Sequence, residues 1–179
     1  MDPWVAVVQF SLIFTMVMMA VLGTVAYSRR QVAGAVGFIL ICLGAFIWAG
    51  VYLLELRAIS VEAKFLFFRL KYIGLLILAG SLPAFALTFR NIFQRLGQTP
   101  NYFLGIFPAI SFLIIIASSK HTFFINNLRL LTVGPFTVLD YDPAPWYSIN
   151  LIYLLLMVVV AVILIFIQAL STSGIFRWQ

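Results

Sequence analysis

The sequence has few charged residues. Eleven lysines and arginines and five aspartates and glutamates occur among 179 residues, which is 9% of the chain, while 64% is hydrophobic and the mean hydropathy is +1.14. Soluble domains carry about 25% charged and about 45–50% apolar residues. This composition excludes an ordinary soluble globular protein and predicts an integral membrane protein.

Residues that usually carry catalysis or bind metals are also scarce. Cys42 is the only cysteine and His121 the only histidine, so the chain has no disulfide framework and no Cys/His cluster. Neither a GxxxxGK phosphate loop nor an HExxH motif is present. We therefore expect no enzymatic activity in this chain, no cofactor and no metal site.

The net charge of +6 does not indicate a nucleic-acid partner. The basic residues are dispersed in ones and twos at the ends of apolar runs, without a basic stripe or a recognition motif. Such cations are typical of residues that fix the orientation of membrane helices.

The apolar residues fall into five runs. A helix needs about 20 mainly apolar residues to cross a bilayer, and the predicted spans are 4–27, 32–54, 61–89, 102–119 and 145–170. The first run is longer than a signal-peptide core and has its basic pair, Arg29 and Arg30, after it rather than before it. The predicted fold class is an all-α integral membrane protein, a five-helix transmembrane bundle forming a single domain over 1–179.

One long connection separates the fourth and fifth spans. Within the predicted loop 120–144, the stretch TFFINNLRLLTVGPFTVL is rich in β-branched and aromatic residues on both sides of Gly134 and Pro135. This pattern predicts a small β-hairpin or an irregular lid.

The positions of the cations favour an N-terminus outside the cell. Raw counts of Lys and Arg are nearly equal on the two sides, so the positive-inside rule alone is almost silent. The connections that would then lie inside are short and purely basic, however. Their cations are Arg29, Arg30, Arg90, Arg95 and Arg177.

The stretch ELRAISVEAKFLFFRLK, residues 55–71, is exceptional because it holds six charged residues between two apolar runs. A charge at membrane depth costs at least about 2.5–3.5 kcal/mol and usually finds a partner. Glu55 closes the second span, so we predict that it pairs with Arg69 or Lys71 at the start of the third. The simpler interpretation is that all six residues lie at the membrane interface, where the long basic side chains extend to the lipid headgroups. We favour this interpretation for Arg57, Glu62 and Lys64.

Other residues allow two interpretations. Trp48, Tyr52 and Tyr72 are typical of aromatic anchors at the membrane interface, or they line a cavity. His121 is either a loop histidine or a ligand contact. Pro83 frees a backbone carbonyl and is expected to kink the third span.

The run WAGVYLLELRAISVEAKFLFFRLKYIG, followed by LPAFALTFR, resembles the N-terminal seven-transmembrane sensor region found ahead of histidine kinases, and sometimes diguanylate cyclases, in prokaryotes. The resemblance continues through SSKHTFFIN and PAPWYSINLIYLLLM. The matching positions are Trp48, Glu55, Arg69, Tyr72, Gly74 and Pro83.

The resemblance implies a signal-input module in a prokaryotic cytoplasmic membrane. Its partners would be membrane lipid, a small-molecule ligand that the sequence does not identify and a cytoplasmic kinase or cyclase output domain, and a homodimer is an assembly it allows. The ligand-binding or signalling candidates are Trp48, Tyr52, Glu55, Arg69, Tyr72, His121 and Trp146. A small membrane transporter or accessory membrane protein is the alternative function.

The family has two further spans where this sequence has none. The segment SGIFRWQ, residues 173–179, is similar to the short inner segment that follows the family's fifth span. Because five spans are present where seven are expected, we expect the chain to be a truncated piece of a larger receptor.

Overall fold

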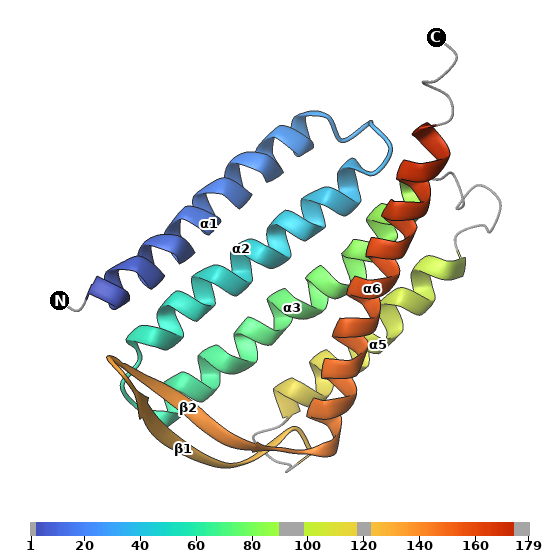
Figure 1. Cartoon of the computed structure of the whole chain (residues 1–179). Helices are drawn as coiled ribbons and strands as arrows, with labels where there is room; N and C mark the ends of the chain where they lie inside the picture. Colours follow the sequence, from blue (N-terminus) through green and yellow to red (C-terminus); the bar gives the residue numbers. More distant parts are fainter. Residues whose placement is uncertain (1–2, 90–98, 118–122, 174–179) are drawn as a thin grey trace.

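The computed structural model of the chain describes residues 3–89, 99–117 and 123–173. These residues form five α-helices and one β-hairpin (Figure 1). The helices are α1 (Pro3–Ser28), α2 (Ala35–Arg57), α3 (Val61–Phe89), α5 (Thr99–Ala117) and α6 (Pro145–Ser173). The strands are β1 (Ile125–Val133) and β2 (Phe136–Pro143).

The helices lie side by side, and the hairpin crosses one end of the bundle (Figure 1). We call this the hairpin end. It contains the starts of α1, α3 and α6 and the C-terminal ends of α2 and α5; the other end is called the opposite end. α3 is the central helix because it packs against α2, α5 and α6 and contacts both strands, whereas α1 packs mainly against α2.

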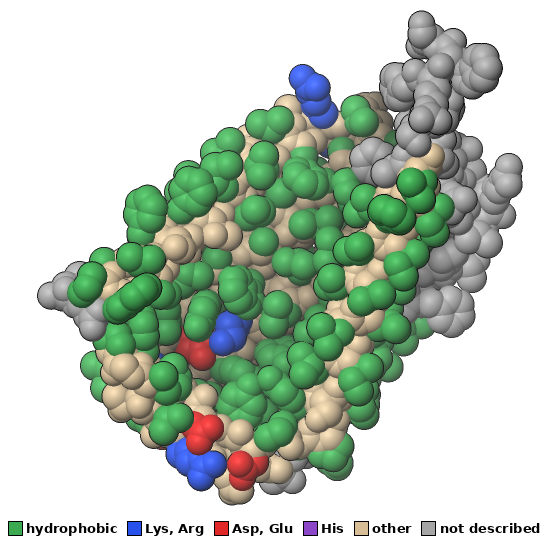
Figure 2. Space-filling model, viewed as in Figure 1, with side chains coloured by type: hydrophobic (Ala, Val, Ile, Leu, Met, Phe, Trp, Pro, Cys, Tyr) green, Lys and Arg blue, Asp and Glu red, His purple; other side chains and the backbone are tan. Residues whose placement is uncertain are grey.

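Four of the described helices are long and apolar enough to cross a membrane: α1, α2, residues 61–88 of α3 and residues 145–167 of α6. α5 adds a shorter apolar stretch, Gly105–Ala117. Their outward surfaces carry large apolar side chains, such as Phe10, Leu113 and Phe166. Figure 2 shows a largely hydrophobic face on which most of the charged side chains lie toward the hairpin end, while one Lys or Arg side chain protrudes at the opposite end. The prediction of a helical membrane bundle is confirmed.

α2 and α3 approach each other closely at two glycines. A Cβ atom at Gly44 would lie 2.8 Å from the Gly74 carbonyl oxygen, and one at Gly74 would lie 2.7 Å from the Gly44 carbonyl oxygen. Both distances are too short for real contacts, so only glycine lets the two backbones meet here. This contact aligns the end of α2 with the beginning of α3.

The predicted hairpin is present between α5 and α6. β1 and β2 pair in antiparallel register, and Val133 faces Phe136 across the turn formed by Gly134 and Pro135. Gly134 has a φ of +57°, a left-handed conformation that glycine adopts without a Cβ penalty. The Arg129 side chain spans the strands with an ion pair to Asp140 at 2.6 Å.

We predict that Gly74→Ala lowers the stability of the bundle by about 1–3 kcal/mol, the usual cost of overpacking a well-packed interior. The matched control is Gly105→Ala in α5, where an added Cβ meets nothing within 4 Å. Thermal unfolding of both variants in the same detergent measures the difference. Equal midpoints for the two variants would show that the α2–α3 backbone contact does not constrain the fold.

Candidate functional site

The last turns of α2 place a carboxylate inside the bundle. Glu55 is buried, with 7% of its surface exposed. Its Oε2 atom accepts a hydrogen bond from Lys71 Nζ of α3 at 2.5 Å, which forms a largely buried ion pair. Of the two predicted partners, the structure therefore selects Lys71. Each charge relieves the cost of burying the other.

A second lysine reaches the same place. Lys64 is 1% exposed, and its Nζ donates a hydrogen bond to the backbone carbonyl of Glu55 at 2.8 Å. That carbonyl lies in the last turn of α2, where it also accepts a hydrogen bond from the Ala58 amide at 3.3 Å and carries partial negative charge. The interface interpretation of Lys64 was therefore wrong: its ammonium caps the C-terminus of α2. We call Glu55, Lys64 and Lys71 the polar centre.

Aromatic rings surround the Lys71 ammonium. Its Nζ lies 4.6 Å from the centre of the Tyr52 ring and 5.3 Å from that of Phe68. The electron-rich ring faces attract the cation, most strongly where water is excluded. Trp48 packs beside Tyr52 with 5.5 Å between ring centres. The two aromatic candidates on α2 thus lie next to one another, and Tyr52 contacts the polar centre directly.

A cluster of five rings joins α3 to the hairpin and α6. We call it the aromatic cap, and its members are Phe68, Tyr72, Phe124, Tyr141 and Tyr147. Tyr72 is 4% exposed and meets Phe124 edge-on at 5.0 Å. The Tyr141 hydroxyl donates to the Tyr147 hydroxyl at 2.9 Å. Burial and this hydrogen bond raise the pKa of Tyr141, so the phenol stays neutral.

Arg69 lies apart from the Glu55 pair. Its Nη1 is 3.4 Å from the carbonyl oxygen of Ile116 on α5, and its guanidinium stands over the Phe65 ring at 4.6 Å. Its Nε is buried without a hydrogen-bond partner among the described residues. Arg69 therefore links α3 to α5 instead of to α2.

The remaining candidates are dispersed. Trp146 stacks on Phe107 at 5.8 Å and lines an apolar pocket of about 500 Å³ between α5 and α6. Pro83 is fully buried within α3, which continues as one helix through it; the kink stays a prediction. His121 lies outside the described residues.

Sequence reasoning missed several members of the site. Lys64 precedes Lys71 by seven residues, so the two share a helical face, and that spacing was the available signal. Phe124, Tyr141 and Tyr147 come from distant segments, and only the folded hairpin brings them over α3.

The arrangement suits binding and conformational coupling. Among residues 3–89, 99–117 and 123–173, no group of three or more His, Cys, Asp or Glu side chains could hold a metal ion. What the site does offer is a buried ion pair between two helices, covered by aromatic rings from a third helix and a hairpin.

The fold and this site define a polytopic α-helical membrane protein with an ion pair near one end. The family model described as the N-terminal 7TM region of histidine kinase matches residues 11–179. The chain belongs to this family, and the resemblance seen in its sequence is confirmed. No curated protein and no solved structure matches it.

We predict that Glu55→Gln destabilises the protein by about 3 kcal/mol, because it leaves Lys71 buried without its counter-charge. Glu62→Gln is the matched control, since Glu62 is exposed on the first turn of α3, and its effect is expected to stay within about 0.5 kcal/mol. Unfolding in detergent and in lipid measures both variants.

A double variant separates the pair from the single side chains. Glu55→Gln combined with Lys71→Gln is expected to cost less than the sum of the two single changes, because it removes both charges together. Additive costs would mean that the two groups do not interact.

Proposed function

We propose that this chain is the signal-input module of a histidine kinase or related receptor and that the polar centre with its aromatic cap is where the input changes the structure. Membership of the histidine-kinase 7TM family supports the general role. The observation that carries the specific one is the buried Glu55–Lys71 pair between α2 and α3, beneath the hairpin.

The mechanism follows from how the pair is held. A ligand shifts a conformational equilibrium only by binding one arrangement better than the other. The Phe68 ring lies 5.3 Å from Lys71 Nζ and 5.1 Å from the ring of Tyr141 on β2, so a ligand that displaces the hairpin also changes the surroundings of the ion pair. Breaking or remaking that pair then moves α3 relative to α2.

α3 is the element that carries the change across the membrane. α3 has 29 residues, and from Lys71 it continues to Phe89 at the opposite end, a rise of about 27 Å at 1.5 Å per residue. Pro83 lies in its second half and cannot donate a helical hydrogen bond, which makes this region the place where α3 bends most easily. The output domain would receive the movement at the opposite end.

The proposed orientation has the N-terminus and the hairpin outside a prokaryotic cytoplasmic membrane. In this orientation the exposed Arg29 and Arg30, which lie in a short connection without acidic residues, are inside, and the Asp140 and Asp142 side chains of the hairpin are outside. The ligand would therefore arrive from outside or from the outer part of the membrane.

We predict that Lys71→Gln in the full-length receptor changes basal autophosphorylation several-fold, because it alters the balance between the two arrangements. Arg57→Gln, on an exposed cation at the end of α2, is the matched control and is expected to leave output unchanged. Autophosphorylation is measured in proteoliposomes that contain equal amounts of each membrane-inserted variant. A Lys71→Gln receptor with normal basal and stimulated output would refute the role of the polar centre.

We predict that a cysteine replacing Ser60 is labelled by an impermeant thiol reagent in intact cells and that one replacing Val32 is labelled only after lysis. Both positions are exposed, at the hairpin end and the opposite end respectively, while the native Cys42 is buried and contributes little background. The reverse labelling pattern would place the N-terminus inside.

A further inference from the structure

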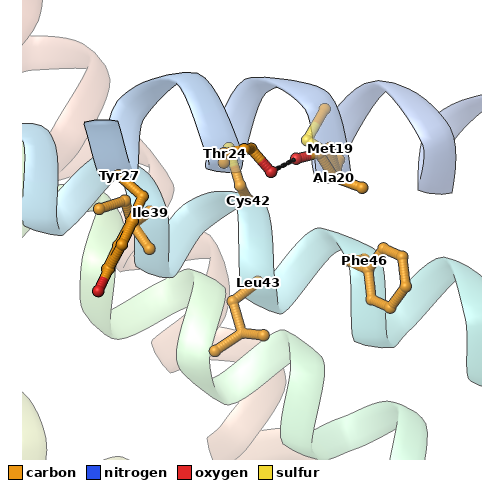
Figure 3. A pocket seen from close by; sticks show the side chains of 9 residues that line it. Met19, Ala20, Thr24, Tyr27, Ile39, Cys42, Leu43 and Phe46 are labelled. Carbon is orange, nitrogen blue, oxygen red and sulfur yellow. Dashed lines mark hydrogen bonds between the residues drawn. The ribbon is translucent and has the colours of Figure 1, made fainter. Parts of the chain in front are cut away.

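A crevice between α1 and α2 lies far from the polar centre. It has a volume of about 350 Å³, at the small end of the range for ligand pockets. α1 contributes Met19, Ala20, Gly23, Thr24 and Tyr27, and α2 contributes Ile39, Cys42, Leu43 and Phe46. Figure 3 shows Tyr27 and Ile39 at one end of the crevice and Phe46 at the other.

The crevice is suited to a hydrocarbon chain. Its lining is nearly all apolar, and the Thr24 hydroxyl already donates to the Ala20 carbonyl at 2.8 Å (Figure 3). Leu43 and Phe46 are exposed on the surface that faces lipid, so a chain can enter from the bilayer without crossing the bundle. The α1 residues from Met19 to Tyr27 extend about 12 Å along the helix axis, which matches part of one acyl chain.

Positive charge lies at the Tyr27 end of this crevice. The Arg30 guanidinium stands over the Tyr27 ring at 4.9 Å, and both Arg29 and Arg30 are exposed. α2 begins at the same place, and no side chain caps its N-terminus at Gly34. The Ala35 amide donates to the Val32 carbonyl at 3.1 Å, and the positive end of the helix dipole favours an anion nearby. The acidic residues within the described ranges all lie toward the hairpin end, so none neutralises these cations.

We propose that this crevice binds one anionic phospholipid. One acyl chain occupies the space between α1 and α2, and the phosphate accepts hydrogen bonds from Arg30 and from the Tyr27 hydroxyl near the start of α2. The combination of an apolar crevice and positive charge at its Tyr27 end distinguishes this site from the general lipid-facing surface. The inference does not depend on the proposed sensing function.

Native mass spectrometry of the purified chain tests the proposal. The chain is equilibrated with phosphatidylglycerol and phosphatidylcholine that carry the same acyl chains, and lipid retention is compared. We expect retention of phosphatidylglycerol over phosphatidylcholine and a loss of about fivefold in Arg30→Gln, the effect of one juxtamembrane cation on an anionic lipid. Arg57→Gln, which removes an exposed cation at the hairpin end, is the matched control and is expected to retain the lipid.

Two further variants test whether the crevice holds the acyl chain. Ala20→Leu and Leu43→Trp each fill the crevice from a different helix, and both are expected to lower phosphatidylglycerol retention while helical circular dichroism stays normal. Ala6→Leu adds the same bulk to an exposed position of α1 outside the crevice and is expected to have no effect. If both filling variants lose helicity, the Arg30→Gln result decides the proposal, since that side chain is exposed.

Several outcomes would overturn the inference. Equal retention of the two lipids would exclude recognition of the headgroup charge. If Arg30→Gln and Arg57→Gln lowered phosphatidylglycerol retention equally, the binding would be due to the general positive charge of the protein surface. Normal phosphatidylglycerol retention in crevice-filling variants that keep their helicity would exclude binding of an acyl chain in the crevice. Competition by excess inorganic phosphate as effective as that by phosphatidylglycerol would identify a site for the free anion instead of a lipid.

Discussion

The ion pair between Glu55 and Lys71 is the contact on which the hairpin end of this protein depends. A carboxylate at this depth is costly alone, and so is an ammonium. Together they join α2 to α3, with 2.5 Å between Lys71 Nζ and Glu55 Oε2. Lys64 Nζ also donates a hydrogen bond to the backbone carbonyl of Glu55 at 2.8 Å. One residue of α2 is thus held by two residues of α3, through its side chain and its backbone.

The packing around the polar centre is arranged to keep this contact. Toward the opposite end from the charges, Gly44 and Gly74 bring the α2 and α3 backbones together, which fixes the register of the two helices. Next to the hairpin, the rings of Tyr72 and Phe124 fill the space between it and α3. Excluding water strengthens every electrostatic interaction inside. In the function proposed above, a disturbance of the hairpin would reach the ion pair through the aromatic cap, and a change in the ion pair would move α3 relative to α2.

Much of this architecture could be predicted from the sequence because a bilayer restricts what an apolar run can form. The helices, a hairpin or irregular lid around Gly134, and a pairing of Glu55 with either Arg69 or Lys71 follow from local patterns; only the structure distinguishes Lys71 from Arg69. Lys64 was misassigned because charge near a helix end usually snorkels, and its target is a backbone carbonyl that leaves no mark in the sequence. Tyr141 lies 73 residues after Phe68 and Tyr147 lies 75 residues after Tyr72, so the contacts of these rings are a product of the tertiary fold.

A charge exchange at the polar centre, made in the proposed full-length receptor, tests most directly whether the Glu55–Lys71 pair couples α2 to α3. Glu55→Lys and Lys71→Glu each place two like charges together, whereas the double variant restores an ion pair of opposite polarity and leaves the Lys64 contact with the backbone in place. Ligand-independent autophosphorylation and thermal stability are measured for all three. Both single variants are expected to be impaired, and the double variant is expected to recover most of both properties. A double variant no better than the worse single variant would show that the pair does not couple α2 to α3.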